Sequence, residues 1–245
     1  MKTLAFLALI IIASALILPI AGCISEADKH LKAGVESQNR WEYKEAIAEY
    51  DEAIRLNPDY TDVYYNRGLA YFKLGQLERA IQDYSEAIRL NPDYADAYYN
   101  RGLVYFNLAQ PERAIQDYDE AVRLNSDHAY AYYNRGLAYF DLGQLERAIQ
   151  DYDEAIRLNP DDITAYNNRG VAYFNLGQLE RAIQDYSEAI NLYPVYAEAY
   201  YNRGLAYRLL GKKTEAITNF KVFINLTRNP ELIEMVSQQI EELSK

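Results

Sequence analysis

Residues 61–94 read TDVYYNRGLAYFKLGQLERAIQDYSEAIRLNPDY, and this stretch decides the fold because it recurs along the chain. The tripeptide Asn-Arg-Gly starts at Asn66, Asn100, Asn134, Asn168 and Asn202, each 34 residues after the previous copy. Blocks 61–94 and 129–162 agree at 28 of 34 positions. A period of this length indicates a solenoid of stacked units, none of which can bury its apolar face alone.

Each block predicts two helices, because its apolar residues recur at helical spacing in two segments. In block 61–94, Gly75 ends the first helix, and Asn91-Pro92 ends the second because proline disfavours helix in the residue before it. With Ala27 as the first position, the chain divides into six units: 27–60, 61–94, 95–128, 129–162, 163–196 and 197–230. Residues 231–245 predict an amphipathic helix that covers the open end of the stack.

One glycine column lies inside the expected first helices: Gly34, Gly68, Gly102, Gly136, Gly170 and Gly204. Glycine within a helix costs about 1 kcal/mol relative to alanine, so its recurrence predicts that the second helix passes too close for a Cβ. The expected opposing surface is the small column Ala46, Ala80, Ala114, Ala148, Ala182 and Ala216.

The first 26 residues have the composition of a targeting segment. Met1–Lys2 give a short basic start, an apolar run follows over Leu4–Ile20, and Gly22 precedes the single cysteine, Cys23. This layout resembles the lipobox of prokaryotic lipoproteins, which implies a signal peptide at 1–22, a lipid on Cys23 and a spacer at 23–26. The alternative is an uncleaved transmembrane helix, since about 17–25 apolar residues can span a bilayer. Both interpretations predict an extracytoplasmic protein anchored to the membrane of the cell envelope.

The repeat itself resembles the tetratricopeptide repeat over residues 27–230. Glycine in the first helix, two alanine columns and an aromatic residue in the second, and proline between units carry this resemblance. It implies an all-α, right-handed superhelix whose first helices line a concave groove. It also implies a scaffold or assembly factor that binds a protein or peptide partner, rather than an enzyme. Small lipoproteins of this family that assist envelope assembly have the same general layout.

Several columns are expected in that groove. Asparagine carries both donors and an acceptor, so a row of asparagines can bond an extended peptide backbone without reading its sequence. The expected peptide-binding residues are Asn66, Asn100, Asn134, Asn168, Asn202, Tyr65, Tyr99, Tyr133, Tyr201, Phe106 and Phe140. In the alternative interpretation, these aromatic rings pack adjacent units and the asparagines bond to neighbouring backbone. A second candidate function is binding of cell-wall glycan, with tyrosine faces as stacking platforms.

Two charged columns predict ion pairs between units. Arginine is present in units two to six, whereas the acids are present in units one to five. If each acid pairs with the arginine of the next unit, every member of both columns is matched. The predicted pairs are Glu49–Arg67, Asp83–Arg101, Asp117–Arg135, Asp151–Arg169 and Asp185–Arg203.

Other classes of function find little support in the sequence. The formal net charge of -11 disfavours nucleic acid as a partner. The two histidines, His30 and His128, lie in separate units without metal-ligand spacing, and His128 is expected in a solvated turn between units. No phosphate-binding loop is present. We therefore expect no metal, no cofactor and no catalysis, while the partner's identity and the oligomeric state stay open.

Overall fold

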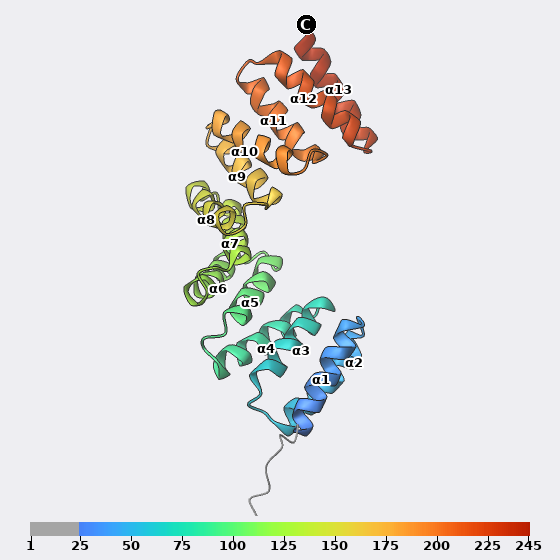
Figure 1. The fold of residues 1–245 in the computed structure, drawn as a ribbon, viewed down its shortest axis with the longest axis vertical. Coiled ribbons are helices and arrows are strands. Elements are labelled where there is room, and N and C mark those ends of the chain that lie inside the picture. The colour runs from blue at the N-terminus through green and yellow to red at the C-terminus, as the bar shows by residue number, and fades with distance from the viewer. Residues whose placement is uncertain (1–24) are drawn as a thin grey trace, which may run out of the picture.

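The computed structural model describes residues 25–245 as a curved stack of helix pairs that runs from α1 at one end to α13 at the other (Figure 1). The predicted signal peptide and the predicted lipid site at Cys23 lie outside the described residues. Each unit contributes two helices, as the period predicts. The helices are α1 (Glu26–Asn39), α2 (Tyr43–Leu56), α3 (Thr61–Lys73), α4 (Leu77–Leu90), α5 (Ala95–Asn107), α6 (Pro111–Leu124), α7 (Ala129–Asp141), α8 (Leu145–Leu158), α9 (Ile163–Asn175), α10 (Leu179–Leu192), α11 (Ala197–Leu209), α12 (Lys213–Leu226) and α13 (Pro230–Ser244).

The turn within each unit needs one residue in the left-handed region of φ. Gly75 takes this conformation with φ of 71°, and Gly143, Gly177 and Gly211 do the same in their units. Glycine adopts positive φ without steric cost, which is why it recurs at this turn. Trp41 and Ala109 occupy the same turn position in units one and three, with φ of 66° and 53°.

The core lies along the seam where the second helix of each unit packs against both its own first helix and the first helix of the next unit. Alanines fill the closest contacts: Ala46, Ala80, Ala114, Ala148, Ala182 and Ala216 are all fully buried. Side chains this small allow helix axes to approach closely. The larger space is filled by one buried ring per unit, at Tyr50, Tyr84, Tyr118, Tyr152, Tyr186 and Phe220.

These rings, rather than the alanine side chains, oppose the glycine column. A Cβ added to Gly136 would lie 2.7 Å from Cε1 of Tyr152, and the nearest alanine atom is the carbonyl oxygen of Ala148 at 3.3 Å. The predicted close approach is therefore confirmed, but the predicted opposing surface is wrong. The Cδ1–Cε1 edge of an aromatic ring lies nearest to the glycine, because the second helix carries this ring opposite the first.

The last helix covers the open end of the stack, as predicted for residues 231–245. Asn229 caps α13 with its side-chain oxygen, which accepts from Glu231 N at 3.0 Å. Val236 is fully buried against α12. Arg208 of α11 donates to Gln239 of α13 at 2.8 Å, which explains an arginine at a position where four other units have phenylalanine.

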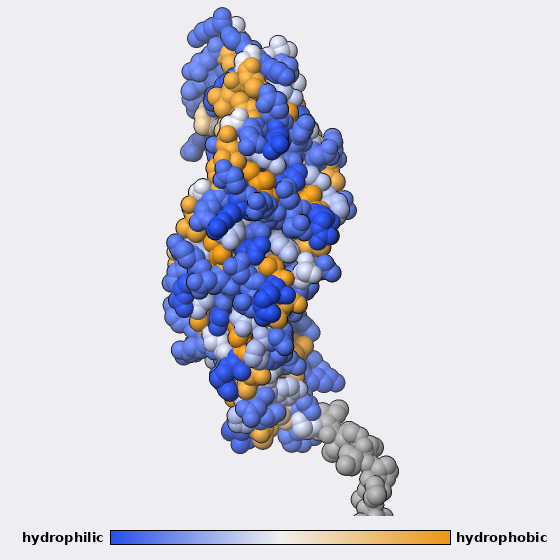
Figure 2. Space-filling view, turned by 90° about the vertical axis from the view of Figure 1, so that its left-hand side faces the viewer, coloured by the Kyte–Doolittle hydropathy of each residue, from blue (hydrophilic) through white to orange (hydrophobic). Residues whose placement is uncertain are grey.

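The surface between these elements is mostly polar. Figure 2 shows one face of the molecule, on which hydrophilic side chains alternate with small hydrophobic patches along the stack. None of the helices within residues 25–245 is both long and apolar enough to cross a membrane.

Candidate functional site

The arginines of units two to five pair with the aspartate of their own unit. They do not pair with the acid of the preceding unit that the sequence predicts. Arg67 donates two hydrogen bonds to Asp83 of its own unit, from Nε to Oδ2 at 2.8 Å and from Nη2 to Oδ1 at 2.7 Å. The same paired geometry joins Arg101 to Asp117, Arg135 to Asp151 and Arg169 to Asp185. The predicted pairs Glu49–Arg67, Asp83–Arg101, Asp117–Arg135, Asp151–Arg169 and Asp185–Arg203 are therefore wrong.

A different column links the units. The remaining Nη1 of Arg67 contacts Asp51 of the preceding unit at 2.5 Å. Each arginine lies on a first helix between two second helices, so it bonds 16 residues forward and 16 residues backward in sequence. The backward partners are Asp51, Ser85, Asp119, Asp153 and Ser187.

The ends of the arginine column explain why matching the number of arginines to the number of acids predicts the wrong pairs. In unit one, Glu49 has no arginine and contacts Nδ1 of His30 at 2.6 Å instead. In unit six, Arg203 donates to the neutral Asn219 at 2.9 Å. A neutral or titratable side chain therefore satisfies each terminal position, and no offset between units is needed.

These pairs are buried charges that depend on one another. Asp151 is only 5% exposed. Burial raises the pKa of Asp151, and the bonds from Arg135 oppose that rise. An arginine fork can satisfy both carboxylate oxygens at once, which makes it suited to this position.

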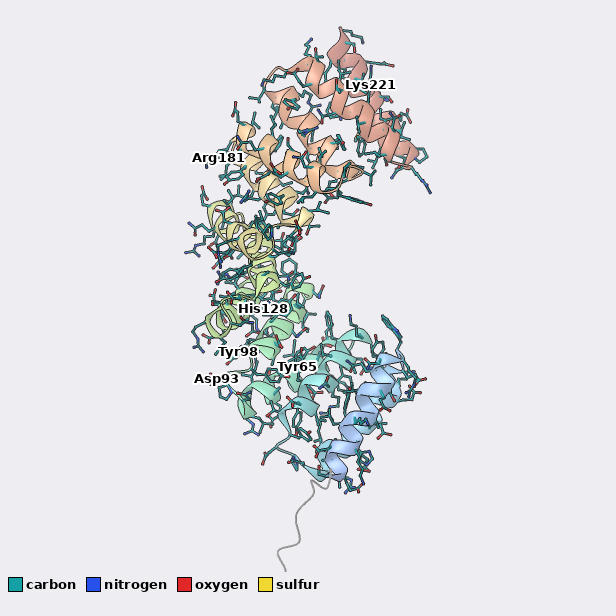
Figure 3. The ribbon with its side chains drawn as sticks, viewed as in Figure 1. Tyr65, Asp93, Tyr98, His128, Arg181 and Lys221 are labelled. Carbon is teal, nitrogen blue, oxygen red and sulfur yellow. The ribbon has the colours of Figure 1, made fainter. Side chains whose placement is uncertain are left out.

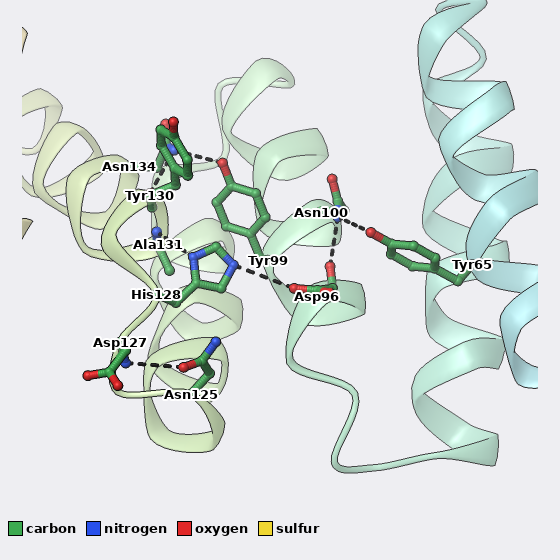
Figure 4. A network of polar contacts seen from close by, with 10 residues as sticks. All are labelled: Tyr65, Asp96, Tyr99, Asn100, Asn125, Asp127, His128, Tyr130, Ala131 and Asn134. Atoms are coloured by element: carbon green, nitrogen blue, oxygen red, sulfur yellow. Dashed lines mark hydrogen bonds and ion pairs between the residues drawn. The ribbon is translucent and has the colours of Figure 1, made fainter. Parts of the chain in front are cut away.

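The asparagine row forms a hydrogen-bonded ladder with the tyrosine row of the preceding unit (Figure 4). Nδ2 of Asn100 donates to the hydroxyl of Tyr65 at 3.1 Å and to the backbone oxygen of Asp96 at 2.8 Å. Asn134 bonds in the same way to Tyr99 and to the backbone of Tyr130. The ladder continues as Asn168 to Tyr133 and Asn202 to Asn167, whereas Asn66 bonds to the backbone of Asp62.

The amide nitrogens of this row thus hold the stack together, in line with the alternative interpretation. The side-chain oxygens of Asn100 and Asn134 accept no hydrogen bond from residues 25–245. Both side chains are only half-buried. These asparagines can therefore offer their side-chain oxygens to a bound chain as hydrogen-bond acceptors.

The tyrosine row also packs against other rings of its own units. The ring centroid of Tyr65 lies 6.1 Å from that of Tyr84 and 4.9 Å from that of Tyr94, which precedes the next unit. Tyr65 is labelled in Figure 3. Tyr99, Tyr133 and Tyr201 make comparable contacts with rings of their own second helices.

His128 does not lie in a solvated turn. It precedes α7, and its side chain is 12% exposed. The imidazole ring packs on Tyr99 at 4.6 Å, Nδ1 accepts from Ala131 N at 3.2 Å, and Nε2 lies 3.7 Å from Asp96 (Figure 4). Burial lowers the pKa of His128, partly offset by the charge of Asp96.

Two cavities lie between neighbouring first helices and are related by the 34-residue period. The first, of about 200 Å³, is lined by Leu137, Phe140, Asp141, Tyr152, Asn168 and Val171. The second, of about 180 Å³, is lined by Val171, Phe174, Asn175, Tyr186, Asn202 and Leu205. The structure therefore places the predicted Asn168, Phe140 and Asn202 at the walls of open cavities.

One lining column was missed from the sequence: Leu69, Leu103, Leu137, Val171 and Leu205. Each lies three residues after the asparagine and three before the phenylalanine or Arg208, so the three positions share one helix face. That spacing was available in the sequence, but a half-buried leucine is indistinguishable from core. We call the surface formed by these asparagine, leucine and phenylalanine positions the first-helix face.

Within the described residues, no group of three or more histidine, cysteine, aspartate or glutamate side chains is arranged to hold a metal ion.

Stacked helix pairs with a repeated seam and a row of cavities define an α-solenoid of the kind that serves as an interaction scaffold. The family model described as TPR repeat matches residues 42–75, 70–108, 136–177 and 172–211. Further tetratricopeptide repeat models match 95–128, 117–150 and 197–230. The chain belongs to the tetratricopeptide repeat family.

Solved structures of the same fold cover most of the chain. The crystal structure of MamA is 26% identical, with a TM-score of 0.64 over 68% of this chain and 91% of the other. YrrB, described as a tetratricopeptide repeat protein with an unusual peptide-binding site, is 25% identical, with a TM-score of 0.69 over 77% of this chain and 97% of the other. The pilus biogenesis factor PilW, at 18% identity and a TM-score of 0.72 over 86% and 97% of the two chains, shares the fold.

Curated relatives match short segments. An uncharacterised protein of Methanocaldococcus jannaschii is 38% identical over 55 residues, which are 22% of this chain and 64% of that protein. The Hsp70-Hsp90 organizing protein of Triticum aestivum is 45% identical over 51 residues, 21% of this chain and 9% of its own length. These matches concern repeat units and not whole proteins.

Proposed function

We propose that this protein is a scaffold that holds an extended segment of a protein partner along its first-helix face. The observation that carries the proposal is the pair of period-related cavities, each lined by a phenylalanine and by an asparagine of the predicted groove. The likeness to YrrB, whose description names a peptide-binding site, supports the same function.

The chemistry of the face suits an extended chain. Leucine, valine and phenylalanine positions supply apolar area for side chains of the segment. The oxygens of Asn100 and Asn134 supply acceptors for its backbone N–H groups. Because the repeats place these acceptors at regular intervals, one segment can contact several units in succession.

The proposal includes a membrane tether. Signal cleavage before Cys23 and lipid attachment to its thiol would leave three residues, Ile24 to Glu26, before the first predicted unit. The stack would then project from the membrane of the cell envelope, with unit one nearest to it. Metabolic labelling with a fatty-acid analogue tests this part, and labelling that persists in Cys23→Ser would contradict it.

The test of the binding function is crosslinking in the native cell, followed by mass spectrometry of what is captured. The double variant Asn100→Ala with Asn134→Ala should reduce capture of the partner by about tenfold, the effect of losing one or two net hydrogen bonds. The matched control is Gln116→Ala with Gln150→Ala, two exposed residues on second helices. Unchanged capture by the asparagine variant, or capture of wall glycan in place of protein, would contradict the proposal.

A further inference from the structure

We propose that the cavity between α7 and α9 is a subsite for an arginine side chain of the partner segment. This proposal rests on the proposed function and adds a chemical requirement for the segment. The cavity joins an apolar floor to the carboxylate of Asp141, which makes no ion pair or hydrogen bond with residues 25–245.

The floor of the cavity is apolar. Leu137 and Phe140 of α7 face Val171 of α9 across about 200 Å³. Such a floor accepts the methylene stem of a long side chain while its charged end remains in a polar setting. A short or negatively charged side chain would leave this space unfilled or place like charges together.

The polar wall of the cavity is made of acceptors. Asp141 is exposed and makes no ion pair or hydrogen bond with residues 25–245. Tyr152 also lines the cavity, but its hydroxyl is fully buried and is therefore not offered to a ligand. Nδ2 of Asn168 donates to Tyr133, and the amide oxygen of Asn168 accepts no hydrogen bond from residues 25–245, so it is available as an acceptor.

The neighbouring cavity provides a natural comparison. It repeats the tyrosine, asparagine, phenylalanine and apolar positions, but Asn175 replaces Asp141. Across units two to six, this position reads Lys73, Asn107, Asp141, Asn175 and Leu209. The α7–α9 cavity is therefore the one position in this series that bears a negative charge.

Arginine fits this combination of groups. Its guanidinium has five N–H donors and no acceptor, which complements the carboxylate of Asp141 and the amide oxygen of Asn168. Its planar fork can bond both oxygens of a carboxylate, whereas a lysine ammonium acts as a point charge. The charge of Asp141 thus selects a cation, and the two oxygens of its carboxylate favour the planar fork of arginine.

The test is an NMR titration of the full chain with N-acetyl-arginine amide, and with the neutral N-acetyl-citrulline amide of the same length. We expect the arginine probe to shift the side-chain amide of Asn168 and the backbone amide of Val171. It should bind about fivefold more weakly to Asp141→Asn, in keeping with a partly exposed ion pair. Citrulline should bind both proteins equally weakly.

The gain-of-function control is Asn175→Asp, which gives the second cavity the same carboxylate. It should add shifts at Asn202 for the arginine probe and not for citrulline. Equal binding of the two probes to the wild-type chain, or arginine binding that Asp141→Asn leaves unchanged, would overturn the subsite.

Failure here differs from failure of the proposed function. If arginine does not bind while partner capture still depends on Asn100 and Asn134, the subsite is wrong and the scaffold function stands. If the arginine probe behaves as expected while capture ignores the asparagines, the cavity binds arginine but the scaffold function is wrong.

Discussion

The buried seam and the first-helix face follow the same period but repeat with different fidelity. In the seam, arginine recurs in five consecutive units, and its bonded partner is aspartate in four of them. On the first-helix face, the position of Asp141 holds one cation, one anion and three neutral residues in five units. A buried charge tolerates few partners, whereas an exposed position can vary, so the seam fixes the stack and the face can select what binds.

The largest effect should follow from breaking the seam. Arg135→Ala leaves the buried carboxylate of Asp151 without its partner, so we expect a loss of about 3–5 kcal/mol in the free energy of unfolding. Urea denaturation followed by circular dichroism measures it. Arg147→Ala, which removes an exposed arginine bonded to Gln144, should cost less than about 1 kcal/mol. Equal effects of the two variants would contradict the role given to the seam.

A smaller effect should follow from crowding the seam. Gly136→Ala places a Cβ 2.7 Å from the Tyr152 ring, and overpacking of this kind costs about 1–3 kcal/mol. Gly143→Ala is the matched control, because nothing lies within 4 Å of its added Cβ and only its positive φ is unfavourable. We expect about 1 kcal/mol for the control. If Gly143→Ala were the more damaging change, the ring contact would not be what requires glycine.

The stability of the fold should depend on pH through His128. Burial lowers the pKa of this histidine, so below its ordinary value the unfolded chain binds more protons than the folded one. Stability should therefore fall as the pH falls from about 7.5 to about 5.5. In His128→Asn the decline should be shallower, as measured by urea midpoints across this range. A steeper decline in the variant would show that protonation of His128 stabilises the fold, through Asp96.

The smallest effect should come from the face itself. Asp141→Asn removes an exposed carboxylate with no partner in residues 25–245, so the free energy of unfolding should stay within about 0.5 kcal/mol. The same denaturation experiment measures it. A loss as large as that of Arg135→Ala would mean that the face, too, serves stacking.

Much of the fold follows from the period alone, because glycine, proline and apolar spacing act locally. The helix pairs, the turn at Gly75 and the capping helix α13 all agree with the sequence. The pairing of Arg67 does not follow in the same way. Two acids, Asp51 and Asp83, both contact its guanidinium, and the sequence also offers Glu49. Only the packing of three helices decides among them.

The candidate site, too, follows from the sequence only in part. The asparagine row could be found as a column, but its bonds to Tyr65 and Tyr99 depend on how adjacent units stack. The cavities depend on the shapes of side chains from two units, and no single column specifies them. The exposed turn at Trp41 has positive φ with a bulky side chain, and its only local signal in the sequence is the missing glycine.

The most direct test of the central claim is site-specific photocrosslinking in the native cell. A benzophenone amino acid at Phe140 lies on the first-helix face, and one at Arg181 lies on the exposed surface of α10, which Figure 3 labels. The proposed function predicts that position 140 crosslinks the partner and that position 181 does not. Equal crosslinking at both positions, or crosslinking at 181 alone, would contradict it.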